Sequence, residues 1–564
     1  MINSSKKIFV FLIFGCIISF GLVAQTSAKE DVPKGWHLKD KQTDGYYGIS
    51  LDKAYDFVKG KKGKTVIVAV IDSGVDTTHE DLKAVLWHNP KEIPGNGIDD
   101  DKNGYIDDVY GWNFIGGRDG KNLKEDSYEV ARVYHKYKDR FQNLSDPSSL
   151  SKDDQDRYKM WLKAKQQIAG DPKDLLNLML IKKAYKEAIP ADSILRKEMD
   201  KESYTGAELE SFAPADEEGR KAKKSVLLIY QGLGIDLQSI SKEILAEIGD
   251  YVQSEERKAE SAEKAPKDFR GEIVKDNYND LNDRFYGNND VMANTPFHGT
   301  HVSGIIAAVR NNGIGMEGIA DNVKIMMVRA VPDGDEHDKD IALAIRYAVD
   351  NGAEVINMSF GKNFSPEKNW VDDAVRYAES KGVLLIHAAG NDGADVDTTD
   401  NFPNPIFKDN HMKATNWITV GASGDPKAGG LVASFSNYGK KEVDVFAPGV
   451  KIYSTIPGGN TYGNAQGTSM ASPVVVGLAA FILTYYPELS AEQVKYAIEK
   501  SASKADIDVV NPGNGEKVKL DEISKSGGVV NAYEAIKLAS TLKGERNKEI
   551  KVKTKSSVKE KVKG

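Results

Sequence analysis

Residues 65–74 read TVIVAVIDSG, and this stretch decides the fold class. Thr65–Ile71 is an unbroken run of β-branched and aliphatic residues, as expected for a strand that is buried on both faces. Asp72 ends the run, and Ser73-Gly74 follow as a tight turn. A carboxylate is therefore expected at the carboxyl end of a buried strand, where open α/β sheets place their ligand crevice.

Further runs of this kind follow along the chain, separated by amphipathic helical stretches such as Asp340–Asp350 and Trp370–Ser380. Each of these helical stretches ends just before a glycine, the expected stop signal. The additional strands are predicted at Val323–Val331, Glu354–Phe360, Val383–Ala389 and Trp417–Ala422. The alternation predicts an α/β fold, with a doubly wound, mostly parallel sheet and helices on both faces.

The alternation stops between residues 113 and 290, where the chain becomes rich in lysine, glutamate and alanine. We interpret this segment as an inserted helical subdomain of ordinary domain size with solvated charged faces. We assign it no chemistry.

Composition excludes several classes of function. The chain has 564 residues, is 40% hydrophobic and carries a net charge of −8, which argues against a nucleic-acid partner. Cys16 is the single cysteine, so an intramolecular disulfide and a cysteine-based zinc cluster are excluded.

The N-terminus has the features of a secretory signal peptide over residues 1–28. Lys6 and Lys7 precede an apolar stretch from Ile8 to about Ala24, and small residues follow. Two alternatives stay open: a membrane-anchoring helix, and a lipoprotein signal that uses Cys16. The signal predicts an exported protein, placed outside the cell, in a periplasm or at the cell surface.

A nucleophile is suggested by residues 467–473, GTSMASP, which open an apolar helical run. Ser469 would lie at a helix N-terminus, where unpaired N–H groups and the positive end of the dipole suit a developing oxyanion. Taken alone, the serine could equally be a helix cap.

A serine nucleophile needs an imidazole base and a carboxylate that orients it. Residues 296–304, PFHGTHVSG, contain two histidines at the start of a small-residue helix, His298 and His301, and Asp72 supplies the carboxylate. The two histidines could also be metal ligands on one face of a helix, but neither an HExxH pattern nor a third cysteine or histidine ligand accompanies them. The catalytic residues of α/β-hydrolases require a histidine after the serine in the sequence. The last histidine, His411, precedes Ser469, so that fold is excluded.

Five blocks in this order resemble the signatures of the subtilases, the subtilisin-like serine endopeptidases. They are VAVIDSGVD (68–76), HGTHVSG (298–304), VINMSFG (355–361), AAGND (388–392) and GTSMASP (467–473). The resemblance implies a serine endopeptidase in which Asp72 orients the base, His298 is the base and Ser469 is the nucleophile. It also implies an oxyanion-binding amide on Asn391, and a structural role for His301.

Substrate-binding residues are implied by the same resemblance. Ser359, Phe360 and Gly361 are similar to the strand that pairs with the substrate backbone. Ala388, Ala389 and Gly390 are similar to the opposite wall of the first specificity pocket. Asn401 aligns where many relatives have a glycine at the base of that pocket, which would narrow it.

Calcium is the expected cofactor, and two sites are predicted. Residues 99–108, DDDKNGYIDD, match most of an EF-hand-type loop, with Asp99, Asp101, Asn103, Tyr105 and Asp107 as ligands and Tyr110 where a bidentate glutamate is usual. An acidic solvated turn is the alternative. A second site, implied by the resemblance, uses Asp81 and Asn312.

The predicted organisation is a signal peptide at 1–28, a peptidase domain in two parts at 29–112 and 291–540, the helical insertion at 113–290 and a Lys-rich tail at 541–564. No inhibitory prodomain is recognised between the signal and residues 46–48 (YYG), which resemble a mature start. The predicted partners are polypeptide substrates, with no nucleic acid and no transmembrane span after signal removal; the oligomeric state stays open. The alternative function is a non-catalytic protein-binding module on a subtilase scaffold.

Overall fold

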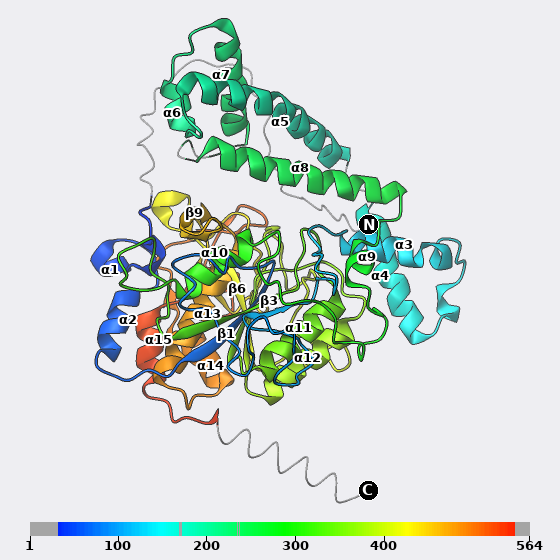
Figure 1. The fold of residues 1–564 in the computed structure, drawn as a ribbon, viewed down its shortest axis with the longest axis vertical. Helices are drawn as coiled ribbons and strands as arrows, with labels where there is room; N and C mark the ends of the chain where they lie inside the picture. Colours follow the sequence, from blue (N-terminus) through cyan, green and yellow to red (C-terminus); the bar gives the residue numbers. More distant parts are fainter. Residues whose placement is uncertain (1–31, 169–171, 234, 236, 238, 547–564) are drawn as a thin grey trace, which may run out of the picture. The chain divides into compact units, whose positions relative to one another are not determined.

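The computed structural model describes residues 32–168, 172–233, 235, 237 and 239–546 (Figure 1). The predicted signal peptide with Cys16 lies outside these residues, as does the tail from residue 547. The chain forms two compact units: unit 1 contains Val130–Lys267, and unit 2 contains the described residues up to Glu129 and those from Asp268 onward.

Unit 2 is built on a nine-stranded sheet with the order β10-β13-β7-β6-β5-β4-β1-β3-β2. Every neighbouring pair is parallel except β10 and β13. In sheet order the strands are Ser503–Lys504, Gly528–Val529, Val445–Pro448, Trp417–Ser423, Leu384–Ala388, Val355–Met358, Val66–Asp72, Val323–Arg329 and Gly111–Asn113. The α/β prediction with a largely parallel sheet is confirmed, and the five predicted strands are β1, β3, β4, β5 and β6.

Strand β1 shows why the sheet is covered on both faces. Val66, Val68 and Val70 belong to one hydrophobic cluster, whereas Ala69 and Ile71 belong to another. Successive side chains of a strand point to opposite faces, so an unbroken apolar run needs helices on both sides.

The helices of unit 2 divide between these two clusters. The first cluster takes residues of α2, α10, α13, α14 and α15, and the second takes residues of α9, α11 and α12. Their bounds are Leu51–Val58 (α2), Phe269–Val274 (α9), Phe297–Ala307 (α10), Asp338–Asp350 (α11), Lys368–Ser380 (α12), Thr468–Tyr485 (α13), Ala491–Ser501 (α14) and Ala532–Ala539 (α15). The short helix α1 (Lys41–Asp44), the antiparallel pairs β8–β9 (Ile452–Ile456, Thr461–Ala465) and β11–β12 (Val509–Val510, Lys517–Val518), and the 3₁₀ helices Trp36–Leu38, Pro426–Ala428 and Leu520–Glu522 complete the unit.

Helix α13 is the one helix in the described chain that is long and apolar enough to cross a membrane. It lies inside unit 2, with 89% of its apolar window buried, so its composition reflects a core position.

Unit 1 is helical and has its own core, formed by residues of α5, α7 and α8 such as Leu195, Val226 and Ile248. Its helices are α3 (Glu129–Phe141), α4 (Lys152–Ile168), α5 (Pro172–Met199), α6 (Gly206–Ser211), α7 (Glu217–Gly232) and α8 (Ser241–Glu263), with a 3₁₀ turn at Pro147–Ser149.

The sequence predicts that the insertion spans residues 113–290, but unit 1 is shorter and spans Val130–Lys267 in the structure. Residues 113–129 and 268–290 belong to unit 2. Strand β2 pairs with β3, and Val274 and Tyr286 contribute to the second cluster of unit 2. These segments are polar overall, so their few core residues gave too weak a signal.

Candidate active site

Asp72 is the last residue of β1, and its carboxylate is 2% exposed. Its Oδ1 accepts a hydrogen bond of 2.7 Å from the backbone N–H of Ser73. The strand ends here because the chain turns sharply at Gly74, whose φ of +133° favours glycine. The turn leaves the carboxylate at the carboxyl edge of the sheet, as the sequence predicts.

His298 lies in the first turn of α10, and its Nδ1 is 2.8 Å from Oδ1 and 3.0 Å from Oδ2 of Asp72. The next residue, Gly299, makes this approach possible, because a Cβ there would lie 2.1 Å from the carbonyl oxygen of Gly74. Burial disfavours the charged imidazolium, but the Asp72 carboxylate outweighs burial and raises the pKa of His298. With Nδ1–H donating to Asp72, Nε2 is the ring atom left to accept a proton.

His301, one helical turn later, has a different environment. It is fully buried, and its Nε2 donates to the carbonyl oxygens of Ile452 and Gly463 at 3.1 and 3.3 Å. Burial, reinforced by the charge of His298, lowers its pKa to about 3. These contacts are with the main chain alone, as expected for a histidine with a structural role.

Ser469 is the second residue of α13, which packs against α10. Its Oγ donates to the carbonyl oxygen of Ser359 at 3.1 Å, and the Ser359 hydroxyl donates back to the Ser469 carbonyl oxygen at 2.9 Å. Within the described structure, Ser469 and His298 share no hydrogen bond. The structure thus brings the serine to the segment that directly follows β4, and the serine hydroxyl makes no hydrogen bond to the imidazole.

Asn391 follows the end of β5 and is exposed. Its Oδ1 accepts from the backbone N–H and the hydroxyl of Thr468, both at 2.9 Å. The amide oxygen is thereby fixed against the residue that precedes Ser469. The orientation leaves Nδ2 as a donor, because it makes no hydrogen bond among the described residues.

The two predicted walls of the substrate pocket lie at the carboxyl ends of the neighbouring parallel strands β4 and β5, so they lie at the same edge of the sheet. One wall is Ser359-Phe360-Gly361, and the other is Ala388-Ala389-Gly390. Asn401 lies between them: its Nδ2 donates to the carbonyl oxygen of Ala389 at 2.8 Å, and a Cβ on Gly361 would lie 2.5 Å from its Oδ1.

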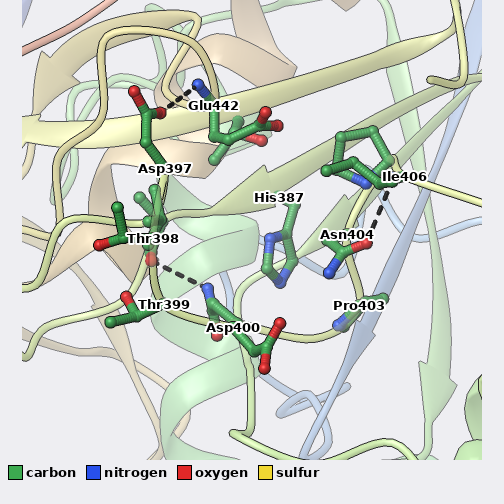
Figure 2. A pocket seen from close by; sticks show the side chains of 14 residues that line it. His387, Asp397, Thr398, Thr399, Asp400, Pro403, Asn404, Ile406 and Glu442 are labelled. Atoms are coloured by element: carbon green, nitrogen blue, oxygen red, sulfur yellow. Dashed lines mark hydrogen bonds between the residues drawn. The ribbon is translucent and has the colours of Figure 1, made fainter. Parts of the chain in front are cut away.

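A pocket of about 180 Å³, shown in Figure 2, adjoins the second wall. Ala389 and Asn401 are among the residues that line it. Its polar lining includes His387, Asp397, Asp400 and Glu442. His387, on β5, donates from Nε2 to the Phe360 carbonyl oxygen at 2.7 Å and so ties one wall to the other. Sequence reasoning missed it because a histidine within an apolar strand carries no motif.

The acidic loop is only partly arranged as predicted. Asp99 and Asp101 have carboxylate oxygens within 4.8 Å of one another and of an oxygen of Glu92. Asp107 does not join them, since its carboxylate accepts the backbone N–H groups of Gly95 and Gly97 at 2.8 and 2.9 Å. Glu92 lies before the loop pattern begins, so the spacing could not reveal it.

Two further predicted ligands, Asn103 and Tyr105, have side chains that contact other residues of the protein. Asn103 donates to Asp108 at 3.0 Å, and its Oδ1 accepts from the Tyr105 N–H at 2.8 Å. The Tyr105 ring packs in the second hydrophobic cluster of unit 2.

Asp81 and Asn312 are brought together, although 231 positions separate them. Asn312 Nδ2 donates to Asp81 Oδ1 at 2.7 Å, and the Tyr462 hydroxyl donates to Oδ2 at 3.3 Å. Asp81 is fully buried, and an uncompensated buried carboxylate is costly, so these two donors compensate it.

Comparison with known proteins agrees with this geometry. The profile of the subtilase family matches residues 63–522. The thermophilic serine proteinase of Bacillus sp. strain AK1 is 41% identical over 240 residues, which are 42% of this chain and 52% of that protein. Subtilisin DY of Bacillus licheniformis is 39% identical over 208 residues, 36% of this chain and 70% of that protein.

Thermitase of Thermoactinomyces vulgaris is 36% identical over 260 residues, 45% of this chain and 79% of that protein. The chain thus spans about half the length of the thermophilic proteinase and most of the other two relatives. Because the family profile covers most of the sequence and agrees with the parallel sheet, this chain belongs to the subtilase family.

Proposed function

We propose that the protein is a serine endopeptidase that cleaves polypeptides through an acyl-enzyme on Ser469. The observation that carries the proposal is the buried Asp72 carboxylate bonded to Nδ1 of His298, which leaves Nε2 free to act as a base. Membership of the subtilase family supports the same function.

In the proposed reaction, Ser469 Oγ attacks the carbonyl carbon of the scissile bond while its proton passes to Nε2 of His298. The resulting oxyanion receives hydrogen bonds from Asn391 Nδ2 and the Ser469 backbone N–H. His298 then returns the proton to the leaving amine, and water hydrolyses the acyl-enzyme by the reverse sequence. Asp72 holds the tautomer and stabilises the imidazolium.

The hydrogen bond from Ser469 to the Ser359 carbonyl oxygen bears on how the site becomes active. The residues around Ser359 are proposed to pair with an extended substrate backbone, as in strand addition. The serine hydroxyl has to turn away from that carbonyl group before His298 can accept its proton.

The test compares wild-type protein with Ser469→Ala on a diverse peptide library. The wild type is expected to hydrolyse internal peptide bonds, and the variant to fall to the level set by transition-state binding alone, about 10³- to 10⁴-fold above water. Equal activity in both proteins would remove the nucleophile assignment. A folded wild type that binds peptides without cleaving any would instead favour the non-catalytic binding module.

Subtilases commonly bind calcium, and we propose that the carboxylates of Glu92, Asp99 and Asp101 hold one ion here. Calcium prefers six to eight oxygen ligands, many of them from carboxylates. The three converging carboxylates would supply oxygen ligands and the negative charge that balances the divalent cation. Asp81 and Asn312 are the second proposed site, on the strength of the family resemblance. Binding restricted to the folded state raises stability by about 2.7 kcal/mol when free calcium exceeds Kd by a hundredfold.

Removing calcium with a chelator should therefore lower the melting temperature. Glu92→Gln is the matched variant, since it keeps the size of the side chain and removes one charge. Its melting temperature should respond less to calcium than that of the wild type. A wild type whose melting temperature is the same with chelator and with calcium would contradict the proposal.

We further propose that the protein is exported. The charged N-terminal residues Lys6 and Lys7, the apolar stretch after them and the small residues 26–28 support a cleaved signal. Mass spectrometry of protein recovered from outside the cell tests this, with a new N-terminus near residue 29 as the expected result.

A further inference from the structure

Lys362 directly follows the proposed substrate strand Ser359–Gly361. Its backbone forms both hydrogen bonds of a bridge to Phe402, one from each N–H, at 2.9 and 2.8 Å. The residue thereby fixes the end of that strand to the segment that also carries Asn401.

The side chain of Lys362 is 2% exposed, so its ammonium group has left water. Such a group needs partners for all three of its N–H bonds. Nζ lies 2.8 Å from Oε2 of Glu129, 2.8 Å from Oδ1 of Asp338 and 2.7 Å from the carbonyl oxygen of Glu336.

These partners belong to two segments that themselves hold one another. The N–H of Glu129 donates to Asp335 at 2.7 Å, and His337 Nε2 lies 2.9 Å from Oδ2 of Asp126. Residues 126–129 are therefore joined to the loop that precedes α11. Glu129 is the last residue of unit 2 and also the first residue of α3, so it lies at the boundary with the helical insertion.

Asp338, the first residue of α11, extends the same network beyond the substrate strand. Its Oδ1 accepts from the Ser365 hydroxyl at 3.0 Å, and its Oδ2 accepts from the backbone N–H of Glu367 at 2.8 Å. One carboxylate thus binds the Lys362 ammonium group and also the chain three to five residues later. The backbone that leaves the substrate strand is held from both directions.

We propose that Lys362 is a positioning residue for substrate binding, which holds Ser359–Gly361 in the extended geometry that a peptide needs for pairing. The inference rests on the proposed peptidase function. The pairing contacts form when the substrate binds and persist in the transition state, so they stabilise the bound substrate and the transition state equally. Loss of such uniform binding raises KM and leaves kcat nearly unchanged.

The test uses the full chain, three single variants and the double variant Lys362→Met/Glu129→Gln. Lys362→Met removes the charge at similar length, and Glu129→Gln removes one partner while Asp338 and the Glu336 carbonyl group remain. Asp276→Asn is the matched control: Asp276 is equally buried and pairs with Arg270 and Lys339, but it makes no contact with Lys362. Each variant is assayed with extended peptides and by the rate of labelling with a small fluorophosphonate, which needs no strand pairing.

Lys362→Met is expected to raise KM for extended peptides about tenfold, with kcat within about twofold of the wild type. Glu129→Gln should also raise KM, but by a smaller factor. The double variant should raise KM by less than the product of the two single fold-changes. The labelling rate should stay at the wild-type value in all three variants. Asp276→Asn should lower the melting temperature while KM stays unchanged.

An unchanged KM in folded Lys362→Met, or an equal KM rise in Asp276→Asn, would overturn the inference and leave a purely structural ion cluster. If Lys362→Met does not fold, Glu129→Gln decides the question by the same two readouts. A wild type that cleaves no peptide would overturn the proposed function itself, so the two failures can be told apart.

Discussion

At the scale of single residues, one carboxylate distinguishes the proposed base, whose side chain is partly exposed, from the buried histidines His301 and His387. Asp72 raises the pKa of His298, whereas burial lowers the pKa of His301 to about 3 and that of His387 to about 4. The folded-state pKa values of the last two lie below 6.5, so the stability they contribute is present above pH 6.5. It is lost as the pH falls towards these values, because the unfolded chain then binds more protons.

The pH dependence of catalysis should reflect His298. A general base must be neutral, so kcat/KM should rise with pH through the raised pKa, with the acid-side midpoint above 6.5. Asp72→Asn should lower kcat about 10⁴-fold, because the amide no longer selects the tautomer that leaves Nε2 free. The same substitution should move the midpoint to lower pH, since the negative charge that raises the pKa of His298 is then lost. A pH–rate profile of both proteins checks this, and an unmoved midpoint would show that Asp72 does not pair with the base.

At the scale of elements, the site depends on how closely α10 and α13 approach the sheet edge. A Cβ on Gly299 would lie 2.1 Å from the Gly74 carbonyl oxygen and 3.2 Å from Cβ of Asp72. The backbone oxygen cannot move aside as a flexible side chain can. The small residue therefore allows the start of α10 to lie against the end of β1.

Gly299→Ala should displace His298 from Asp72 and lower kcat by at least about tenfold, since small misplacements of catalytic groups are costly. Gly232→Ala, at the end of α7, is the control, because a Cβ added there would have no neighbouring atom within 4 Å. Steady-state kinetics and melting temperatures of both variants separate the effects. Full activity in a folded Gly299→Ala protein would show that this close approach is not needed.

The elements that the sequence predicted well are those with strong periodicity or an unbroken apolar run. β1 and β3–β6 are such runs, and α11 and α12 each end two residues before a glycine. The short strand β2 and the segments next to the insertion were missed because they contribute few core residues. In the candidate site, the five motif blocks indicated the residues near the sheet edge, whose roles stay predictions. Glu92, His387 and Lys362 carry no motif, since their positions depend on contacts between segments far apart in sequence.

At the scale of the whole molecule, the two units have separate cores. Leu195 lies in the core of unit 1 and Leu478 in the largest core of unit 2, and both are fully buried. A domain with its own core is able to unfold by itself, so a single two-state transition is not expected for this chain.

Calorimetry should show two transitions. Leu195→Ala should destabilise unit 1 by about 2–5 kcal/mol and lower the midpoint temperature of its transition. Leu478→Ala should leave a comparable cavity in unit 2 and lower the midpoint temperature of the other transition. Peptide hydrolysis should be lost with the transition that Leu478→Ala shifts. A single transition that both variants lower equally would mean that the units unfold together.

The central claim is that Ser469 is a nucleophile activated by His298, and its most direct test is a map of covalent labelling. The protein is treated with a fluorophosphonate, digested and analysed by mass spectrometry, alongside His298→Ala. One adduct is expected, on the peptide that contains Ser469, with a labelling rate that falls sharply in His298→Ala. A folded wild type that stays unlabelled, or that carries the adduct on another residue, would contradict the claim.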